Sequence, residues 1–411
     1  MDDELARIAE KLRTVPALPG RSHPFNEESH GFRLNPPAAE VDVAAFEREH
    51  GVALPAPYRR FVTEIGDGGA GPSYGLRPVA AAYDTVRYLT YEGFLAVPSP
   101  LRDGLGEDWY DEYLDEDLPR DPLDGSLAVA HFGCDQYTVL VVTGDLRGRL
   151  VTVDTAGGVE PYVTEDPDFL SWYERWLDEV AAGYSVEAFG AKLPGDEVAL
   201  LTIMTGDQDA ARRQRAAWSL CCLPALPAAA ASALVTATAD PSDQVRATAL
   251  RTAAEGAIAA VEGPARRAVD TETDANVRAA ALRVLAALAV PDLRQLARRL
   301  LADEHLRDQA ARVLADAGAL TAADLAPLSR DPDPRARASA AHRLSDVTGP
   351  EVPTLLATAL RDADPAVRRL AVQAAGRRRE QSLREAVVAL RDSDPDDLVR
   401  QNAARTLSFW R

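Results

Sequence analysis

The chain has 411 residues, which exceeds the usual size of one compact core and predicts two domains. Apolar residues make up 46% and charged residues 27%, so the composition excludes a disordered chain and predicts a folded one. The net charge of −19 lies entirely in the first half: residues 1–190 carry 15 Arg and Lys against 35 Asp and Glu, whereas residues 191–411 carry 30 against 29.

The first half combines amphipathic helical patterns with alternating strand patterns. Tight turns separate its last three predicted strands, which indicates a small antiparallel meander. An α+β domain over residues 1–190 is therefore expected. In chain order, the predicted elements are a helix over 1–15, a loop over 16–37, helices over 43–50 and 57–65, strands over 76–80, 127–132, 137–143 and 149–154, and a helix over 168–182.

The stretch GDGGAG (66–71) has the glycine content of a phosphate-binding loop. It lacks the GK[ST] ending, carries Asp67 where an anion would be repelled, and follows a helix instead of a strand. We interpret it as a turn that needs positive φ angles.

The segment 107–121 holds eight acidic residues and one arginine. Three readings are open: carboxylates for acid–base or divalent-cation chemistry, a solvated loop, or a partner-binding patch with aromatic anchors. No histidine or calcium-loop glycine organises the carboxylates, which argues against the first reading. The candidate partner-binding residues are Glu107, Asp108, Trp109, Tyr110, Asp111, Glu112, Tyr113, Asp115, Glu116 and Asp117.

The second half repeats one pattern, in which an Asp, often followed by Pro, opens a helix that carries an apolar residue, an Arg and then an Ala three positions later. The spacing of its arginines is nearly constant, at 33, 32, 29, 30, 31 and 32 residues. The pattern predicts an all-α solenoid over residues 196–411, with about seven repeats of about 31 residues. We call the aligned residues the ladder arginines: Arg213, Arg246, Arg278, Arg307, Arg337, Arg368 and Arg400.

Each repeat reads as two helices joined by a turn. In the copy at 352–378, Asp364 is placed to cap the second helix and Pro365 occupies its first position, where no donor is lost. One helix pair cannot cover its own apolar face, so neighbouring pairs must stack and leave a long concave surface.

The ladder arginines have two possible roles. They could line a groove for nucleic acid, helped by Arg377, Arg378 and Arg379, or each could pair with the capping Asp of its own or a neighbouring repeat. We favour the internal pairing, because a nucleic-acid footprint is clearly basic and the net charge of residues 191–411 is only +1.

The repeat motif D-x-D-P-x-V-R-x-x-A resembles the HEAT repeat in a short form. HEAT units usually have about 40–47 residues, whereas ankyrin and tetratricopeptide units are nearer in period. The TPLH tetrad of ankyrin and the Trp, Tyr and Phe positions of tetratricopeptide repeats are absent here. The resemblance covers about residues 196–411.

A second resemblance is carried by three segments of the first half, NPPAAEVDVAAFEREHGVALPAPYRRFVTEIGDGGAGPSYGL (35–76), AHFGCDQYTVLVV (130–142) and DPDFLSWYERWLDEV (166–180). Over about residues 30–182, the first half resembles the SMI1/KNR4 family, or SUKH superfamily. It implies a non-enzymatic domain, because bacterial members commonly bind and neutralise toxins and fungal members act as interaction hubs. The acidic segment and the repeat array depart from the family pattern.

Several classes of protein are not expected. The N-terminus lacks the basic start and apolar stretch of a secretory signal, and no run of about 18 apolar residues occurs. Three cysteines, Cys134, Cys221 and Cys222, form the sparse, odd set typical of a reducing compartment. Neither CxxC nor HExxH is present. We expect a cytoplasmic protein that is not an enzyme, has no cofactor or metal and does not bind a membrane.

The favoured function is a cytoplasmic immunity protein that neutralises a bacterial polymorphic toxin, with a basic toxin domain as its partner and the acidic first half as the contact surface. The alternative is a general protein-interaction scaffold that uses the HEAT concave surface. A nucleic-acid-binding HEAT protein is the third possibility, and the near-neutral second half counts against it.

Overall fold

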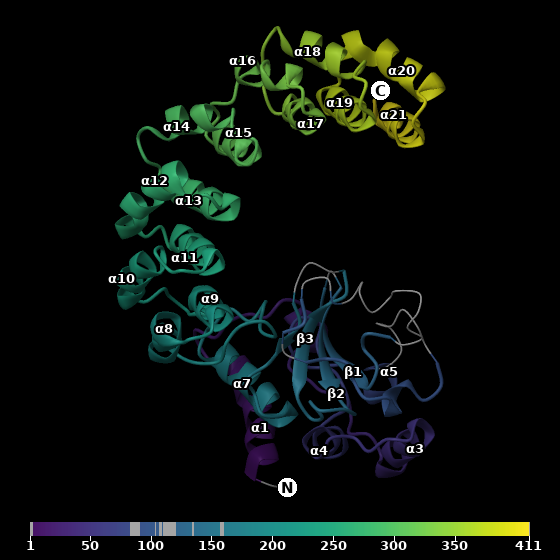
Figure 1. Ribbon diagram of the computed structural model, residues 1–411. Helices are drawn as coiled ribbons and strands as arrows, with labels where there is room; N and C mark the ends of the chain where they lie inside the picture. The colour runs from purple at the N-terminus through teal and green to yellow at the C-terminus, as the bar shows by residue number, and fades with distance from the viewer. Residues whose placement is uncertain are drawn as a thin grey trace. The chain divides into compact units, whose positions relative to one another are not determined.

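The computed structural model describes residues 3–82, 91–102, 104–106, 109, 121–133, 135–156 and 160–410. Contacts divide the chain into two compact units, Met1–Ala233 and Leu234–Arg411 (Figure 1). The predicted boundary at 190–196 lies inside the first unit, which also holds the first helix pair, α8 (Glu197–Gly206) and α9 (Ala210–Ser219). Within the described ranges, no helix has both the length and the apolar character needed to cross a membrane.

The predicted helices of the first unit are present with shifted ends. The last of them begins after Asp168, whose side chain accepts a hydrogen bond from the backbone N–H of Ser171 at 3.0 Å. The predicted loop over 16–37 contains two short helical turns that sequence patterns did not reveal. The elements are α1 (Asp3–Thr14), a 3-10 turn (Val15–Ala17), α2 (Glu27–His30), α3 (Glu40–His50), α4 (Ala56–Glu64), α5 (Val79–Ala82), a 3-10 turn (Phe94–Ala96) and α7 (Phe169–Ala181).

The predicted antiparallel meander is confirmed. Its strands are β1 (Ser126–Gly133), β2 (Gln136–Val141), β3 (Leu150–Asp154) and β4 (Tyr162–Val163), paired in that order. Leu140 lies opposite Leu127 on one side and Leu150 on the other, so the apolar alternation sets the register. Only β4, which has two residues, was not predicted.

The predicted strand over 76–80 is wrong. Leu76 makes only isolated bridges, to Gly69 and Ala130, and Val79 already begins α5. Pro78 cannot donate to a strand ladder, which explains the break. The predicted turn at 66–71 is confirmed, since Gly68 and Gly69 have φ angles of 85° and 103°.

The sheet is buried on both faces, and its strands alternate between two apolar clusters. One cluster packs the sheet against α7, whose Trp172 and Trp176 are fully buried. Tyr173 of α7 also donates a hydrogen bond from its hydroxyl to the carbonyl of Ala70 at 2.8 Å, which ties the helix to the glycine-rich turn. The other cluster holds Leu101, Leu105, Trp109, Leu123, Ala128, Val139, Val141, Val151 and Val153.

A buried charge network fixes the chain that leaves α7. Arg175 contacts Asp166 at 2.8 Å and Glu179 at 3.0 Å, and Lys192 contacts the same Glu179 at 2.8 Å. Lys192 is only 2% exposed, so its ammonium depends on this carboxylate for compensation.

The second unit stacks helix pairs in two layers (Figure 1). The second helices of the pairs, α11, α13, α15, α17, α19 and α21, lie side by side on its inner side, and the first helices cover their backs. The elements are α10 (Ala228–Ala237, which spans the division between the units), α11 (Asp243–Glu255), α12 (Glu262–Thr271), α13 (Ala275–Ala287), α14 (Leu293–Leu300), α15 (Arg307–Asp316), α16 (Ala322–Leu325), α17 (Pro334–Arg343), α18 (Val352–Ala359), α19 (Pro365–Arg378), α20 (Arg384–Ser393) and α21 (Asp397–Phe409).

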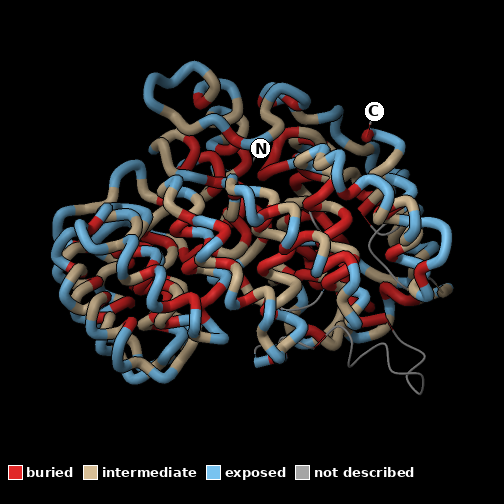
Figure 2. The backbone as a smooth tube through the Cα atoms, turned by 90° about the horizontal axis from the view of Figure 1, so that it is seen from above, coloured by how far each residue is buried: buried red, intermediate tan, exposed pale blue. Residues whose placement is uncertain are grey.

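Alanine makes the close packing of the inner helices possible. The residue three positions after each ladder arginine is alanine in every repeat, and each of these alanines is 0% exposed. Buried and exposed residues alternate along these helices, and Figure 2 shows how burial varies along the described chain. The seven alanines are Ala216, Ala249, Ala281, Ala310, Ala340, Ala371 and Ala403.

Candidate functional site

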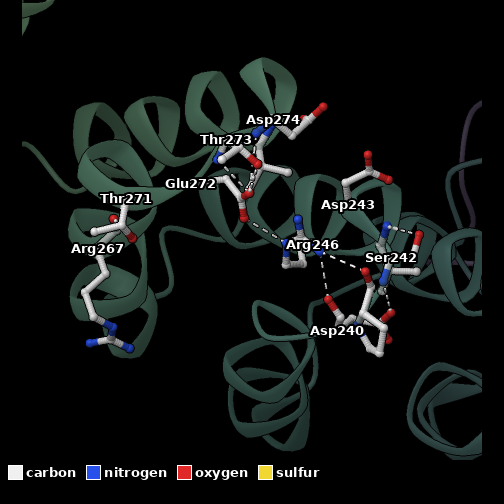
Figure 3. A network of polar contacts seen from close by, with 12 residues as sticks. Asp240, Ser242, Asp243, Arg246, Arg267, Thr271, Glu272, Thr273 and Asp274 are labelled. Carbon is white, nitrogen blue, oxygen red and sulfur yellow. Dashed lines mark hydrogen bonds and ion pairs between the residues drawn. The ribbon is translucent and has the colours of Figure 1, made fainter.

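The ladder arginine of α11 shows how successive repeats are joined (Figure 3). Arg246 donates from Nη1 to the backbone carbonyls of Asp240 at 2.9 Å and Pro241 at 3.0 Å, in the turn before its own helix. Its Nε donates to the carboxylate of Glu272 at 2.9 Å, which belongs to the turn of the next repeat. One guanidinium therefore holds the turn of its own repeat and reaches the following one.

The same geometry recurs further along the array. Arg368 donates through Nε and Nη2 to the two carboxylate oxygens of Asp394, both at 2.7 Å, and through Nη1 to the carbonyls of Asp362 and Ala363. Arg337 makes the equivalent bidentate pair with Asp362 at 2.8 and 3.0 Å. These pairs join residues 25 or 26 positions apart, close to one repeat.

The two acidic residues of the D-x-D motif have different tasks. The first accepts the backbone N–H two residues ahead and receives the arginine of the preceding repeat: Asp394 accepts from Asp396 at 2.9 Å and pairs with Arg368. The second caps the inner helix, as Asp396 accepts from the N–H of Val399 at 2.9 Å. We expected the arginines to pair with the capping Asp. Arg246, Arg337 and Arg368 instead use the acidic residue two positions earlier.

The remaining ladder arginines show what changes at irregular repeats and at the ends. Arg278 pairs with Asp303 at 2.7 Å, and Arg307 lies 3.6 Å from Asp333, which is a capping residue. The two shortest spacings of the arginines, 29 and 30, lie on either side of Arg307. Arg400, with no described repeat after it, contacts Asp397 of its own helix.

Arg213, in the first unit, donates to two carbonyls of its own turn, those of Asp207 at 3.0 Å and Gln208 at 3.1 Å. Its turn contacts therefore match those of Arg246 and Arg368.

Charge pairing changes the pKa values of these groups in the direction expected for mutual stabilisation. The hydrogen bonds from Arg368 lower the pKa of Asp394, and those from Arg337 lower the pKa of Asp362. Burial acts in the opposite direction on both carboxyl groups but is the weaker influence.

A second row of polar side chains lies five residues after the ladder arginines. Arg251, Arg283, Arg312 and Arg405 of this second row are exposed, and none of the four side chains makes a hydrogen bond or ion pair with a described residue. His342 completes the row on α17 and Gln373 on α19; both are half-buried. The sequence contains this row at the same period as the ladder, but we aligned only the ladder arginines and missed it.

The second row faces the inner side of the array. Because the outer helices cover the backs of the inner helices, exposed side chains of the inner helices point away from the outer layer. Partial desolvation and, after it, the positive charge of Arg283 lower the pKa of Arg251, and the charge of Asp274 opposes this shift.

The inner side is hollowed between α19 and α21, where a groove of about 530 Å³ opens. Gln373 of α19 donates through Nε2 to Oδ1 of Asn402 on α21 at 3.0 Å across it. Gly376 allows the close approach, since a Cβ there would lie 2.2 Å from Cγ2 of Thr406. We call this site the arginine groove; its lining residues are Gln373, Gly376, Arg377, Arg379, Asn402, Arg405, Thr406 and Phe409.

The predicted acidic patch is mostly beyond what the structure describes. Trp109 is described, and its side chain is 1% exposed within the apolar cluster on the outer face of the sheet. A ring buried there stabilises the domain and is not presented to a partner. Glu107, Asp108, Tyr110, Asp111, Glu112, Tyr113, Asp115, Glu116 and Asp117 lie outside the described residues.

Four aromatic rings of the first unit, those of Phe25, Tyr74, His131 and Tyr137, contact one another in sequence. Tyr74 stacks on His131 with ring centroids 5.1 Å apart, and His131 stacks on Tyr137 at 4.6 Å. Phe25 meets Tyr74 edge to face at 5.2 Å, and Phe25 and Tyr74 are about half exposed, at 51% and 48%. Burial, followed by the charge of Arg77, lowers the pKa of His131.

The described parts of the chain hold no cluster of side chains suited to binding a metal ion. No group of three or more His, Cys, Asp or Glu side chains lies close enough there to hold a metal ion. Cys221 and Cys222 form no disulfide within the described part of the chain, and Cys134 lies outside it.

Comparison with known protein families identifies one part of the chain. Residues 352–410 match the family described as HEAT repeats. No curated protein matches the chain.

Solved structures resemble the chain only distantly. The archaeal HEAT-like repeats protein from Thermococcus onnurineus NA1 is 15% identical, with 53% of this chain and 97% of that one covered and a TM-score of 0.32. The complex of CpcE and CpcF of phycocyanin lyase from Nostoc sp. PCC7120 is 20% identical, with 52% and 88% covered and a TM-score of 0.32.

Human deoxyhypusine hydroxylase is 21% identical, with 53% and 85% covered and a TM-score of 0.26. These likenesses are too distant to indicate a function. The family match, together with the repeated helix pairs, shows that the C-terminal part of this chain is a HEAT-repeat array.

Proposed function

We propose that this protein is a non-enzymatic protein-interaction scaffold that binds its partner on the inner side of the HEAT array. The observation that carries the proposal is the second row, whose exposed arginines form no hydrogen bond or ion pair with a described residue. Arginine is enriched at protein interfaces because its planar guanidinium makes several directed hydrogen bonds and also packs on apolar groups.

The ladder supports this role by making the array rigid. The pairs of Arg246, Arg337 and Arg368 each join one repeat to the next through charge-assisted hydrogen bonds, which favours a fixed spacing of the second row. A surface that is already ordered loses less conformational entropy when a partner binds. The two rows of arginines therefore have different roles. The ladder arginines stabilise the array, and the second-row arginines are available to bind a partner.

The test uses the full chain with a photo-crosslinking residue at one of two exposed amide positions. Asn276 lies on α13, two turns before Arg283 and on the same face, whereas Gln295 lies on the outer helix α14. A partner bound on the inner side should crosslink from position 276 and not from position 295. Crosslinking from position 295 alone would place the partner on the outer layer and refute the proposal.

A narrower function, neutralisation of a bacterial toxin in the cytoplasm, rests on the resemblance of residues 30–182 to SMI1/KNR4 proteins and on the −20 balance of residues 1–190. Its test is co-expression with the toxin encoded beside this gene, and continued killing by every candidate toxin would reject it. Replacing the seven carboxylates of 107–117 by Asn and Gln should slow association with a basic toxin at low salt. An unchanged rate would remove that segment from the interface.

A further inference from the structure

The charge along the inner side changes at the C-terminal end of the array. Four residues after the second row, α11 and α15 carry the acidic residues Glu255 and Asp316. The equivalent positions on α13, α19 and α21 are Ala287, Arg377 and Phe409. Because residues four apart are neighbours on one helix face, the second-row arginines of α11 and α15 have a carboxylate beside them, and the second-row side chains of α13, α19 and α21 do not.

The arginine groove lies at this end of the array. Arg377, Arg379 and Arg405 are exposed, and their guanidinium groups make no hydrogen bond or ion pair within the described chain. No carboxylate lines the groove. Three cations around one hollow repel each other until an anion enters, which makes the site selective for negative charge.

The groove also offers contacts that a simple ion would not use. Phe409 is 71% exposed at its edge, and the side-chain amides of Gln373 and Asn402 lie on its floor. Amides match the N–H and C=O groups of an extended peptide, and an exposed ring packs on an apolar side chain.

Arg379 follows α19 directly, in the left-handed region with φ of 50°. Ala257, Ala289 and Gly318 have positive φ angles at the same position of their repeats, so the conformation belongs to the repeat. In this repeat the residue is an arginine, and it lines the groove.

We propose that the arginine groove binds an acidic peptide segment of a partner protein, with carboxylates on Arg377, Arg379 and Arg405 and an apolar side chain against Phe409. The inference rests on the proposed scaffold function and names the chemistry of its ligand. Nucleic acid fits less well, because a strand that continued along the inner side would meet Glu255 and Asp316, and the array is nearly neutral.

The experiment measures fluorescence polarisation of a labelled peptide made of glutamates around one central phenylalanine, with the full chain as titrant. The variant Arg377→Gln/Arg405→Gln removes two groove cations. The matched control, Arg361→Gln/Arg384→Gln, removes two exposed cations outside the groove and changes the net charge equally. Thermal unfolding of both variants checks that the array remains folded.

The groove variant should weaken peptide binding by about tenfold for each arginine removed, and the control by less than about threefold. Replacing the peptide's glutamates by glutamine should abolish binding. Equal losses in the two variants, or no peptide binding at all, would overturn the proposal, as would single-stranded DNA of the same charge binding more tightly than the peptide. Crosslinking from position 276 is independent of these results, so the scaffold function can survive the loss of the groove proposal.

Discussion

Replacing Arg368 by methionine tests the ladder where it is most deeply buried. The side chains of Arg368 and Asp394 are 10% and 1% exposed, and two hydrogen bonds of 2.7 Å join them. The substitution leaves the Asp394 carboxylate buried with the N–H of Asp396 as its remaining described partner, and it removes the donor from the carbonyls of Asp362 and Ala363. Removing one member of a buried pair costs about 3–5 kcal/mol, so we expect a loss of that size in the free energy of unfolding.

The matched control is Arg266→Met. Arg266 also pairs with two carboxylates, of Glu262 and Asp292, but all three side chains are at least 36% exposed. Exposed pairs contribute about 0–1 kcal/mol, so the control should be nearly neutral. Urea denaturation of the full chain at neutral pH, followed by far-UV circular dichroism, measures both losses. Equal losses, or a loss below about 1 kcal/mol for Arg368→Met, would refute the ladder as a source of stability.

Two further measurements distinguish the contribution of charge from that of packing at the Arg368–Asp394 pair. The double variant Arg368→Met/Asp394→Leu should recover much of the loss, because an apolar replacement of a whole buried pair is often neutral. The pKa of Asp394 is lowered by Arg368, so the stabilisation is complete above the usual aspartate pKa of 3.8 and is lost as the pH falls through the folded-state pKa. The difference between wild type and Arg368→Met should therefore shrink in acid, and a constant difference would contradict an ionic origin.

Three other predictions concern separate features. Lys192→Met should lower the free energy of unfolding of the first unit by about 3 kcal/mol in urea denaturation, because the ion pair of Lys192 is buried. The control Lys11→Met removes the part-exposed lysine of α1 and should lower it by about 1 kcal/mol or less. Similar losses in the two variants would contradict this prediction. Gly376→Ala should lower the free energy of unfolding by about 1–3 kcal/mol, because the added methyl group overpacks against Thr406. In the double variant with Thr406→Ala this clash is removed, and the higher helix propensity of alanine should leave a net gain of up to about 1 kcal/mol in the same measurement. His131 should titrate by NMR with a pKa below 6.5, so that its contribution to stability is lost as the pH falls; a value above 6.5 would reject its burial.

The sequence predicted correctly those elements that depend on contacts between residues close together in the chain. Asp168 and Asp364 cap helices as expected, because an N-cap needs only a side-chain oxygen and the next few backbone N–H groups. The meander followed from apolar alternation and tight turns. The strand expected over 76–80 failed because Pro78 and the bridges of Leu76 depend on how the glycine-rich turn packs.

Functional positions were harder to predict than helices. Trp109 was read as an exposed anchor because its neighbours in sequence are acidic, yet its ring fills an apolar cluster with side chains from β1, β2 and β3. The second row escaped notice for a different reason. Its arginines have the same period as the ladder, and only burial and partners distinguish a bracing arginine such as Arg368 from a free one such as Arg405.

The sequence by itself determined the repeat, its period and the residues that cap each inner helix, since these depend on contacts within one helix pair. Only the tertiary structure decided which carboxylate each ladder arginine reaches, because the partner lies one repeat away and is selected by how the turns stack. It also brought Arg377, Arg379 and Arg405 around one groove, which requires α19 and α21 to approach at Gly376.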